Sequence, residues 1–194
     1  MISLLGIFLF QNCTPPSYVF QNPRQTGVDF STGDWLINVN GIPAIQEKLK
    51  SLVKNDFSTK LGTRAVFPEE ELATQMLGPM NLSHPNNSQI IEITKFYKYN
   101  YLVNISGTVE RDLGAFQKSN PQLDSGAKFN SSSVSIEIYD LRNGKSIYFQ
   151  KVNATTYLPR SNNDFYVSRS PEVLVSQAYK KLFKDLVKSS AFSK

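Results

Sequence analysis

The sequence has little of the side-chain chemistry on which most enzymes depend. Its 194 residues include a single cysteine, Cys13, and a single histidine, His84. One cysteine cannot form an internal disulfide bond, so the fold must rest on its core alone. One histidine excludes most histidine-dependent catalysis. We therefore expect a non-enzymatic protein with no catalytic residues, no bound metal and no cofactor.

Motifs of common active sites are also missing. The chain has no Gly-x-Ser-x-Gly, no His-Glu-x-x-His and no glycine-rich phosphate loop. Carboxylate-only chemistry stays open, and its weak candidates are Glu69, Glu70, Asp112 and Asp124. The acidic run after Pro68 is better explained as the first turn of a helix, where proline fits and acidic residues complement the helix dipole. His84 lies in a polar loop, and we expect it to be solvated.

Positive charge is present in moderate excess and is spread along the chain. There are 21 Lys and Arg against 16 Asp and Glu, which gives a net charge of +5. A nucleic-acid-binding protein usually shows a basic stripe or an arginine-rich arm, so we expect no nucleic-acid partner. Lys180, Lys184 and Lys188 line one side of the last expected helix. Such a face can meet anionic lipid or glycan, although a solvated surface is the more common role.

Long hydrophobic runs are absent as well. The most apolar stretch, residues 2–10, has nine residues, whereas a membrane-spanning helix needs roughly 20. This length suits the apolar region of a signal peptide, although no Lys or Arg precedes it. A bacterial lipoprotein signal ends in such a segment followed by a cysteine, which is acylated and becomes the first mature residue. Cys13 fits that position, while Asn12 departs from the usual Gly, Ala or Ser.

We therefore predict a lipoprotein signal peptide over residues 1–12 and a lipidation site at Cys13. Residues 13–33 are rich in Pro, Asn, Gln, Ser and Gly, which predicts a flexible tether. The alternative is that residues 2–10 form a core strand and that Cys13 is a small buried residue. The polar, proline-containing segment after Cys13 argues against this alternative. Residues 34–194 are expected to form a single α/β domain.

Hydrophobic periodicity predicts the elements of this domain. Ile45, Leu49, Val53 and Phe57 recur at helical spacing, and Asn143-Gly144 between alternating runs marks a hairpin. The expected strands cover residues 34–39, 63–67, 101–109, 134–139 and 147–157, and the expected helices cover 41–61, 68–77, 89–98 and 170–188. The order β-α-β-α-α-β-β-β-α predicts an α/β (α+β) fold with a mixed sheet of about five strands and helices packed against it.

This order resembles a family of bacterial envelope lipoproteins. The family includes the curli-secretion lipoprotein CsgG, and the lipoprotein activators of penicillin-binding proteins and the N-terminal domain of TolB share its fold. The likeness lies in residues 101–109, which look like a strand ending near a glycine, and in residues 133–145, which look like the family's hairpin. Ser170-Pro171-Glu172-Val173 resembles the start of its last helix.

The resemblance implies a lipid-anchored protein of the outer membrane that faces the periplasm and binds envelope proteins in assembly or secretion, as a monomer or a homo-oligomer. The alternatives are a subunit of a CsgG-like secretion pore and a carboxylate-dependent envelope hydrolase. A pore subunit needs membrane-crossing strands of about 9–11 residues. Residues 110–132 carry charges such as Arg111, Asp112 and Lys118, and residues 158–168 form a short polar turn. The sequence therefore favours the binding protein.

Overall fold

The computed structural model describes residues 15–23, 26–68, 82, 85–96, 98–112, 116–118, 129–157 and 165–190. The larger sheet contains β1 (Ser17–Phe20), β2 (Trp35–Gly41), β3 (Ala65–Val66), β4 (Tyr101–Arg111), β6 (Phe129–Asp140) and β7 (Lys145–Tyr157). A second sheet pairs β5 (Phe116–Lys118) with β8 (Phe165–Val167). The helices are α1 (Pro43–Leu61), α3 (Asn87–Phe96) and α4 (Pro171–Ser189), and η1 (Gly62–Arg64) is a 3-10 turn.

The larger sheet is mixed, as the sequence predicts. Its strand order is β1-β7-β6-β4-β2-β3. β2 runs parallel to β3 and β4, and the other neighbours are antiparallel. The α+β class is thus confirmed, with six strands instead of about five. The expected strand over residues 63–67 is reduced to two residues, because η1 occupies its start. The expected helix over residues 68–77 lies almost wholly outside the described residues.

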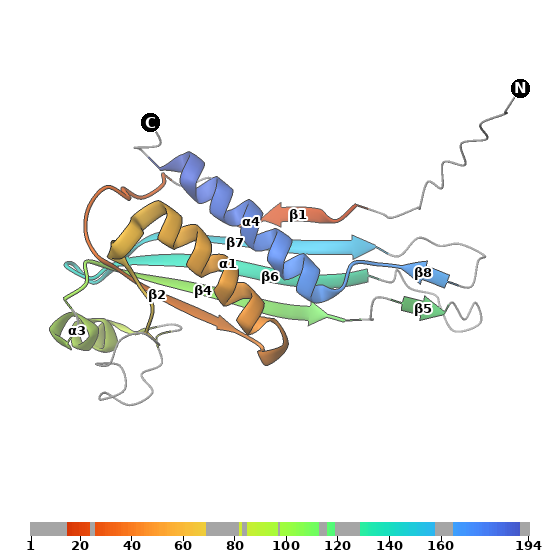
Figure 1. The fold of residues 1–194 in the computed structure, drawn as a ribbon, viewed down its shortest axis with the longest axis horizontal. Helices are drawn as coiled ribbons and strands as arrows, with labels where there is room; N and C mark the ends of the chain where they lie inside the picture. The colour runs from red at the N-terminus through yellow and green to blue at the C-terminus, as the bar shows by residue number, and fades with distance from the viewer. Residues whose placement is uncertain are drawn as a thin grey trace, which may run out of the picture.

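The helices divide between the two faces of the sheet. α1 and α4 cover one face (Figure 1), where they enclose the main core with the alternate residues of β2, β4, β6 and β7. Ile45, Leu49, Val53, Phe57 and Leu61 are the buried residues of α1. Their four-residue spacing keeps them on one side of the helix, as expected from the sequence. α3 contributes to a smaller core with Leu36, Leu102 and Tyr139. Because Leu36 and Leu102 alternate with core-facing Ile37 and Val103, this smaller core lies on the opposite face.

The sequence predicts a flexible tether over residues 13–33. The described residues of this segment instead belong to the folded domain. β1 pairs with β7, with Ser17 opposite Thr155. Further along, Val28 and Phe30 are buried in the main core. The Phe30 ring lies 5.2 Å from that of Trp35, measured between centroids. The polar composition of residues 13–33 conceals these few apolar side chains, which gain stability by pairing and packing with residues far along the chain.

Hydrogen bonds to Asp140 stabilise the turn of the hairpin between β6 and β7. Its carboxylate accepts hydrogen bonds from the backbone N–H of Arg142 at 3.0 Å, from Nε and Nη2 of Arg142 at 2.9 and 2.8 Å, and from Nδ2 of Asn143 at 3.2 Å. Gly144 follows with a φ of 68°, a conformation that glycine adopts without strain. The Asn-Gly signal in the sequence therefore marks the turn correctly.

Replacing Asp140 with asparagine is expected to weaken the hairpin in a pH-dependent way. Hydrogen bonds from Arg142 hold the pKa of the Asp140 carboxyl below its usual range. A lowered folded-state pKa contributes stability above the unfolded value of about 3.9, and this contribution is lost as the pH falls through the folded-state value. Asp140→Asn should therefore lower the Tm at pH 7 by roughly 2–4 °C. Thermal unfolding from pH 7 to pH 2 should show this difference shrinking once the pH falls below about 4 and disappearing below the folded-state pKa of Asp140; a constant difference would contradict the assignment.

Candidate functional site

Among the described residues, the outer edge of the sheet at β2 lacks a strand partner over most of its length. β4 pairs with all of β2, from Trp35 to Gly41. On the other side, β3 pairs only with Trp35 and Leu36. Pro68 follows soon after β3 and has no N–H to donate to a ladder, which fits the early end of the pairing. From Ile37 onward, the outer edge of β2 has no strand partner among the described residues.

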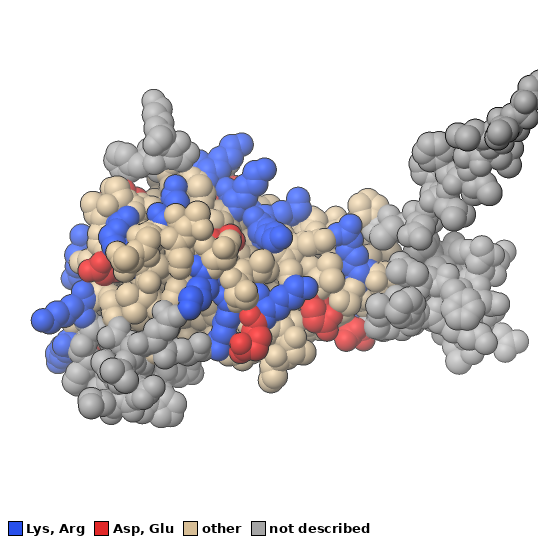
Figure 2. Space-filling view, in the orientation of Figure 1, with Lys and Arg blue, Asp and Glu red and all other residues tan. Residues whose placement is uncertain are grey.

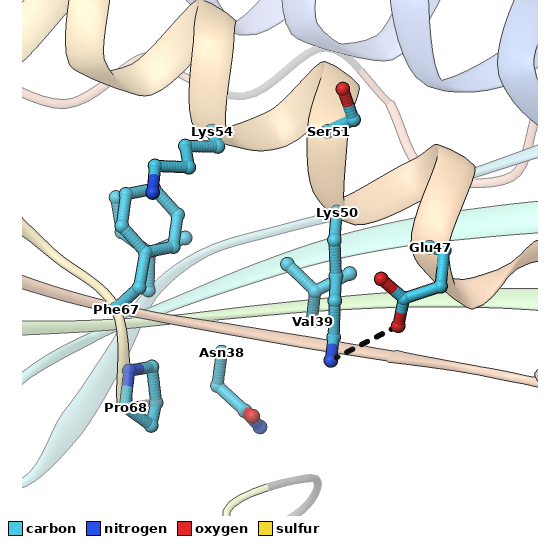
Figure 3. A pocket seen from close by; sticks show the side chains of 9 residues that line it. Asn38, Val39, Glu47, Lys50, Ser51, Lys54, Phe67 and Pro68 are labelled. Atoms are coloured by element: carbon cyan, nitrogen blue, oxygen red, sulfur yellow. Dashed lines mark ion pairs between the residues drawn. The ribbon is translucent and has the colours of Figure 1, made fainter. Parts of the chain in front are cut away.

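A groove of about 310 Å³ lies beside this edge, between β2 and α1. Figure 3 shows its side chains, which come from three segments. The lining residues are Ile37, Asn38 and Val39 on β2, Glu47, Lys50, Ser51 and Lys54 on α1, and Phe67 and Pro68 after β3. The groove therefore combines an apolar surface with charged side chains from one helix.

The charged side chains of the groove lie on its α1 side. The Nζ atom of Lys50 lies 3.7 Å from Oε1 of Glu47. The Nζ atom of Lys54 lies 5.8 Å from the centroid of the Phe67 ring, and Figure 3 shows the two side chains meeting. Lys50 and Lys54 therefore make the α1 side of the groove basic, next to the aromatic ring of Phe67. This combination suits an extended peptide that carries apolar and acidic residues.

Asparagine side chains flank the same edge on the other face of the sheet. We call Asn38, Asn40 and Asn104 the asparagine cluster. The Asn38 side chain points away from α1 (Figure 3), and its Nδ2 donates to Oδ1 of Asn104 at 3.0 Å. Asn104 is 4% exposed. Its Nδ2, and that of Asn40, are buried without a hydrogen-bond partner among the described residues. A buried amide left unsatisfied costs about 1–3 kcal/mol, so a bound segment that supplied acceptors would recover part of this cost.

The groove and the asparagine cluster lie on opposite faces of the sheet beside the same strand, β2, so one added strand would contact both. Side chains of an added strand alternate between the two faces of a sheet. A strand paired with the open edge would direct one side chain toward Phe67 and the lysines, and the next toward Asn40. The sequence signal for this site is the alternation of Ile37 and Val39 with Asn38 and Asn40. This alternation does not by itself indicate a binding site, because a polar position in a strand is usually only solvated.

Of the residues that the sequence offers for chemistry, only Asp112 lies within the described part of the chain. Cys13, Glu69, Glu70, His84 and Asp124 lie outside the described residues. The remaining candidate, Asp112, is exposed directly after β4. Within the described ranges there is no group of three or more His, Cys, Asp or Glu residues placed to hold a metal ion.

The basic residues of α4 form a separate surface. Lys180, Lys184 and Lys188 are exposed, and Figure 2 shows Lys and Arg side chains gathered over this helix. Nζ of Lys181 lies 4.6 Å from the centroid of the Tyr18 ring, which links α4 to β1. Among the described helices, none is long and apolar enough to cross a membrane.

No protein-family model matches the chain. No curated protein sequence matches it either. Solved structures similar to it include the PelC dodecamer from Paraburkholderia phytofirmans, at 12% identity and a TM-score of 0.44 over 89% of this chain and 97% of that one. Lipoprotein GNA1162 from Neisseria meningitidis is similar at 16% identity and a TM-score of 0.44 over 79% of this chain and 99% of that one.

The C-terminal domain of LpoB from Escherichia coli is similar at 14% identity and a TM-score of 0.36 over 65% of this chain and 86% of that one. Likenesses at this identity and TM-score carry no functional inference. The resemblance to CsgG stays a prediction from the sequence.

Proposed function

We propose that this chain is a non-enzymatic lipoprotein of the bacterial cell envelope whose α+β domain binds partner proteins at the open edge of β2. Acyl chains on Cys13 hold it in the outer membrane, with the domain facing the periplasm. The observation that carries the binding role is the edge of β2, which lacks a described strand partner beyond Leu36 and has the groove on one side. On the other side, the buried Nδ2 atoms of Asn40 and Asn104 have no hydrogen-bond partner among the described residues.

The anchor follows from the sequence around Cys13. A single acyl chain holds a protein only marginally in a bilayer, because each buried CH₂ contributes about 0.8 kcal/mol. Three acyl chains on one residue, as in bacterial lipoproteins, give firm attachment. Residues 2–10 supply the apolar segment that precedes such a cysteine.

Partner binding would proceed by strand addition. An extended segment that pairs with Ile37 to Gly41 gains main-chain hydrogen bonds, which provide affinity without sequence preference. Specificity would come from its alternating side chains. An apolar or acidic side chain of the bound segment would contact Phe67, Lys50 and Lys54. The next side chain would carry a hydrogen-bond acceptor and face Asn40 and Asn104. Such an interaction needs neither a nucleophile nor a metal.

The groove can be tested by filling it with a bulky side chain. Ser51 is exposed and lines the groove from α1. Ser51→Trp is expected to weaken partner binding roughly tenfold, because the indole would occupy the space that a bound side chain needs. Cross-linking in intact cells, followed by purification of the anchored protein and identification of cross-linked species, measures this effect. A cross-linked species of twice the mass would identify a second copy of the chain as the partner.

Ser146→Trp is the matched control, because Ser146 is exposed on β7 and lies outside the groove. It introduces the same side chain without a change in charge. We expect its cross-linked species to match those of the unmodified protein. If Ser51→Trp and Ser146→Trp gave the same cross-linked species in equal amounts, the groove would not be the binding site.

A further inference from the structure

The distance between Cys13 and the folded domain is short. Ser17, the first residue of β1, follows Cys13 by four positions. A fully extended chain spans at most about 3.5 Å per residue, so Cys13 lies within about 14 Å of Ser17. If Cys13 carries the lipid anchor, as proposed above, the membrane surface must lie close to the start of β1.

The start of β1 lies at one end of the sheet. Ser17 pairs with Thr155, near the end of β7 at Tyr157. Figure 1 shows β5 and β8 at this same end, while the turn between β6 and β7 lies at the other. β1 is also at the opposite edge of the sheet from β3. An anchor at this position therefore leaves the groove beside β2 on the far edge.

This end of the sheet carries side chains suited to a membrane surface. Phe129 pairs with Tyr157 across β6 and β7, and their ring centroids lie 5.7 Å apart. The guanidinium carbon of Arg111 lies 4.4 Å from the centroid of the Phe129 ring. Tyr157 is 51% exposed, and Val19 on β1 is 59% exposed. We call Arg111, Phe129 and Tyr157 the end cluster.

The chemistry of the end cluster matches that of a phospholipid headgroup layer. Tyrosine is enriched at membrane interfaces, where its ring lies among apolar groups and its hydroxyl meets water. An arginine guanidinium donates paired hydrogen bonds to phosphate. The planar guanidinium of Arg111 lies over an aromatic ring, which is a favourable position for a cation. The aromatic residues and the cation thus occur where the short link to Cys13 requires the bilayer to be.

We propose that the end cluster contacts phospholipid headgroups, so that the domain rests on the membrane with this end of the sheet. The contact fixes the orientation of the domain and keeps the open edge of β2 accessible. It rests on the lipidation of Cys13 that the proposed function includes. The bilayer is the source of the phosphate groups that Arg111 meets.

The orientation can be measured from two positions on one strand. Thr155→Cys and Ser146→Cys each add a free thiol, because the thiol of Cys13 is blocked by acylation. Thr155 lies two positions from Tyr157 and outside the end cluster, so the cluster stays intact. Residues 146 and 155 are nine positions apart on β7, which places them about 30 Å apart. A fluorophore is attached to each thiol in the full acylated protein, reconstituted in vesicles of phosphatidylethanolamine and phosphatidylglycerol. Lipids with a spin label in the headgroup then quench any fluorophore near the membrane surface.

We expect strong quenching at position 155 and little at position 146. Adding Arg111→Glu to Thr155→Cys should lower the ratio of docked to undocked domains roughly fivefold, since a basic residue near an anionic surface contributes to docking. Lys145→Glu makes the same charge change at the other end of β7 and should leave quenching at position 155 unchanged. Equal quenching at both positions, or stronger quenching at position 146, overturns the proposed orientation.

The intact mass of the same protein separates the two proposals. If Cys13 carries acyl chains and the quenching shows no preference for position 155, the orientation is wrong and the proposed function stands. If Cys13 carries no acyl chain, the anchor is wrong and the orientation that depends on it is overturned as well.

Discussion

Cys13→Ser is expected to move the protein almost completely from the membrane fraction to the soluble fraction. Without the thiol of Cys13 no acyl chain can be attached, and the proposed attachment to the membrane is lost. The end cluster alone offers one exposed tyrosine, one arginine and a partly buried phenylalanine, which is far less apolar surface than three acyl chains. Sedimentation of membranes, followed by detection of the protein in pellet and supernatant, measures the change.

The neighbouring residue provides the control for this substitution. Asn12→Gly places at position 12 a residue that is usual before a lipidated cysteine, and we expect it to keep the protein in the membrane fraction. It also tests whether Asn12 limits processing, since faster maturation would show that it does. Unchanged membrane association of Cys13→Ser would rule out the lipoprotein assignment.

Trp35→Ala is expected to lower the free energy of unfolding by about 3–5 kcal/mol. Trp35 is fully buried, and its ring stacks on that of Tyr101 at 4.2 Å between centroids. Its Nε1 donates to the carbonyl oxygen of Thr32 at 3.1 Å. Loss of this side chain leaves a cavity beside Phe30 and removes a hydrogen bond to the segment before β2. Because small domains have only about 5–15 kcal/mol of stability in total, this variant should be close to unfolding at growth temperature.

The stability of Trp35→Ala is measured by denaturant unfolding followed by far-ultraviolet circular dichroism, because Trp35 is the only tryptophan and its fluorescence is lost. Ile147→Ala is the control. Ile147 is a large apolar residue on β7 that is 40% exposed, and its truncation should change stability by about 0.5 kcal/mol or less. Equal effects of the two substitutions would contradict the described core.

Local patterns were sufficient to predict much of the fold. The four-residue spacing from Ile45 to Phe57 predicts α1, and Asn143-Gly144 predicts the hairpin between β6 and β7. Ser170 and Pro171 mark the start of α4. In each case the residues that form the element also carry the signal, so no distant contact is needed. β1 was missed because its four residues form a strand by pairing with β7, more than a hundred positions away.

The candidate site is harder to predict because it depends on how short β3 is at the edge of the sheet. No pattern in residues 63–67 shows that β3 stops after two residues, and because of this early stop most of β2 has no described strand partner on that side. The unsatisfied amides of Asn40 and Asn104 become apparent only when β2 and β4 are placed side by side. Among the carboxylate candidates, the described residues include only Asp112, which is exposed directly after β4.

The proposed anchoring depends on Cys13 as the lipid-bearing first residue of the mature protein. This is tested by the mass of the N-terminal peptide of the protein purified from membranes of a bacterium that expresses the full chain. We expect a peptide that begins at Cys13 and carries three acyl chains. A peptide that contains Asn12 joined to an unmodified Cys13 would contradict it.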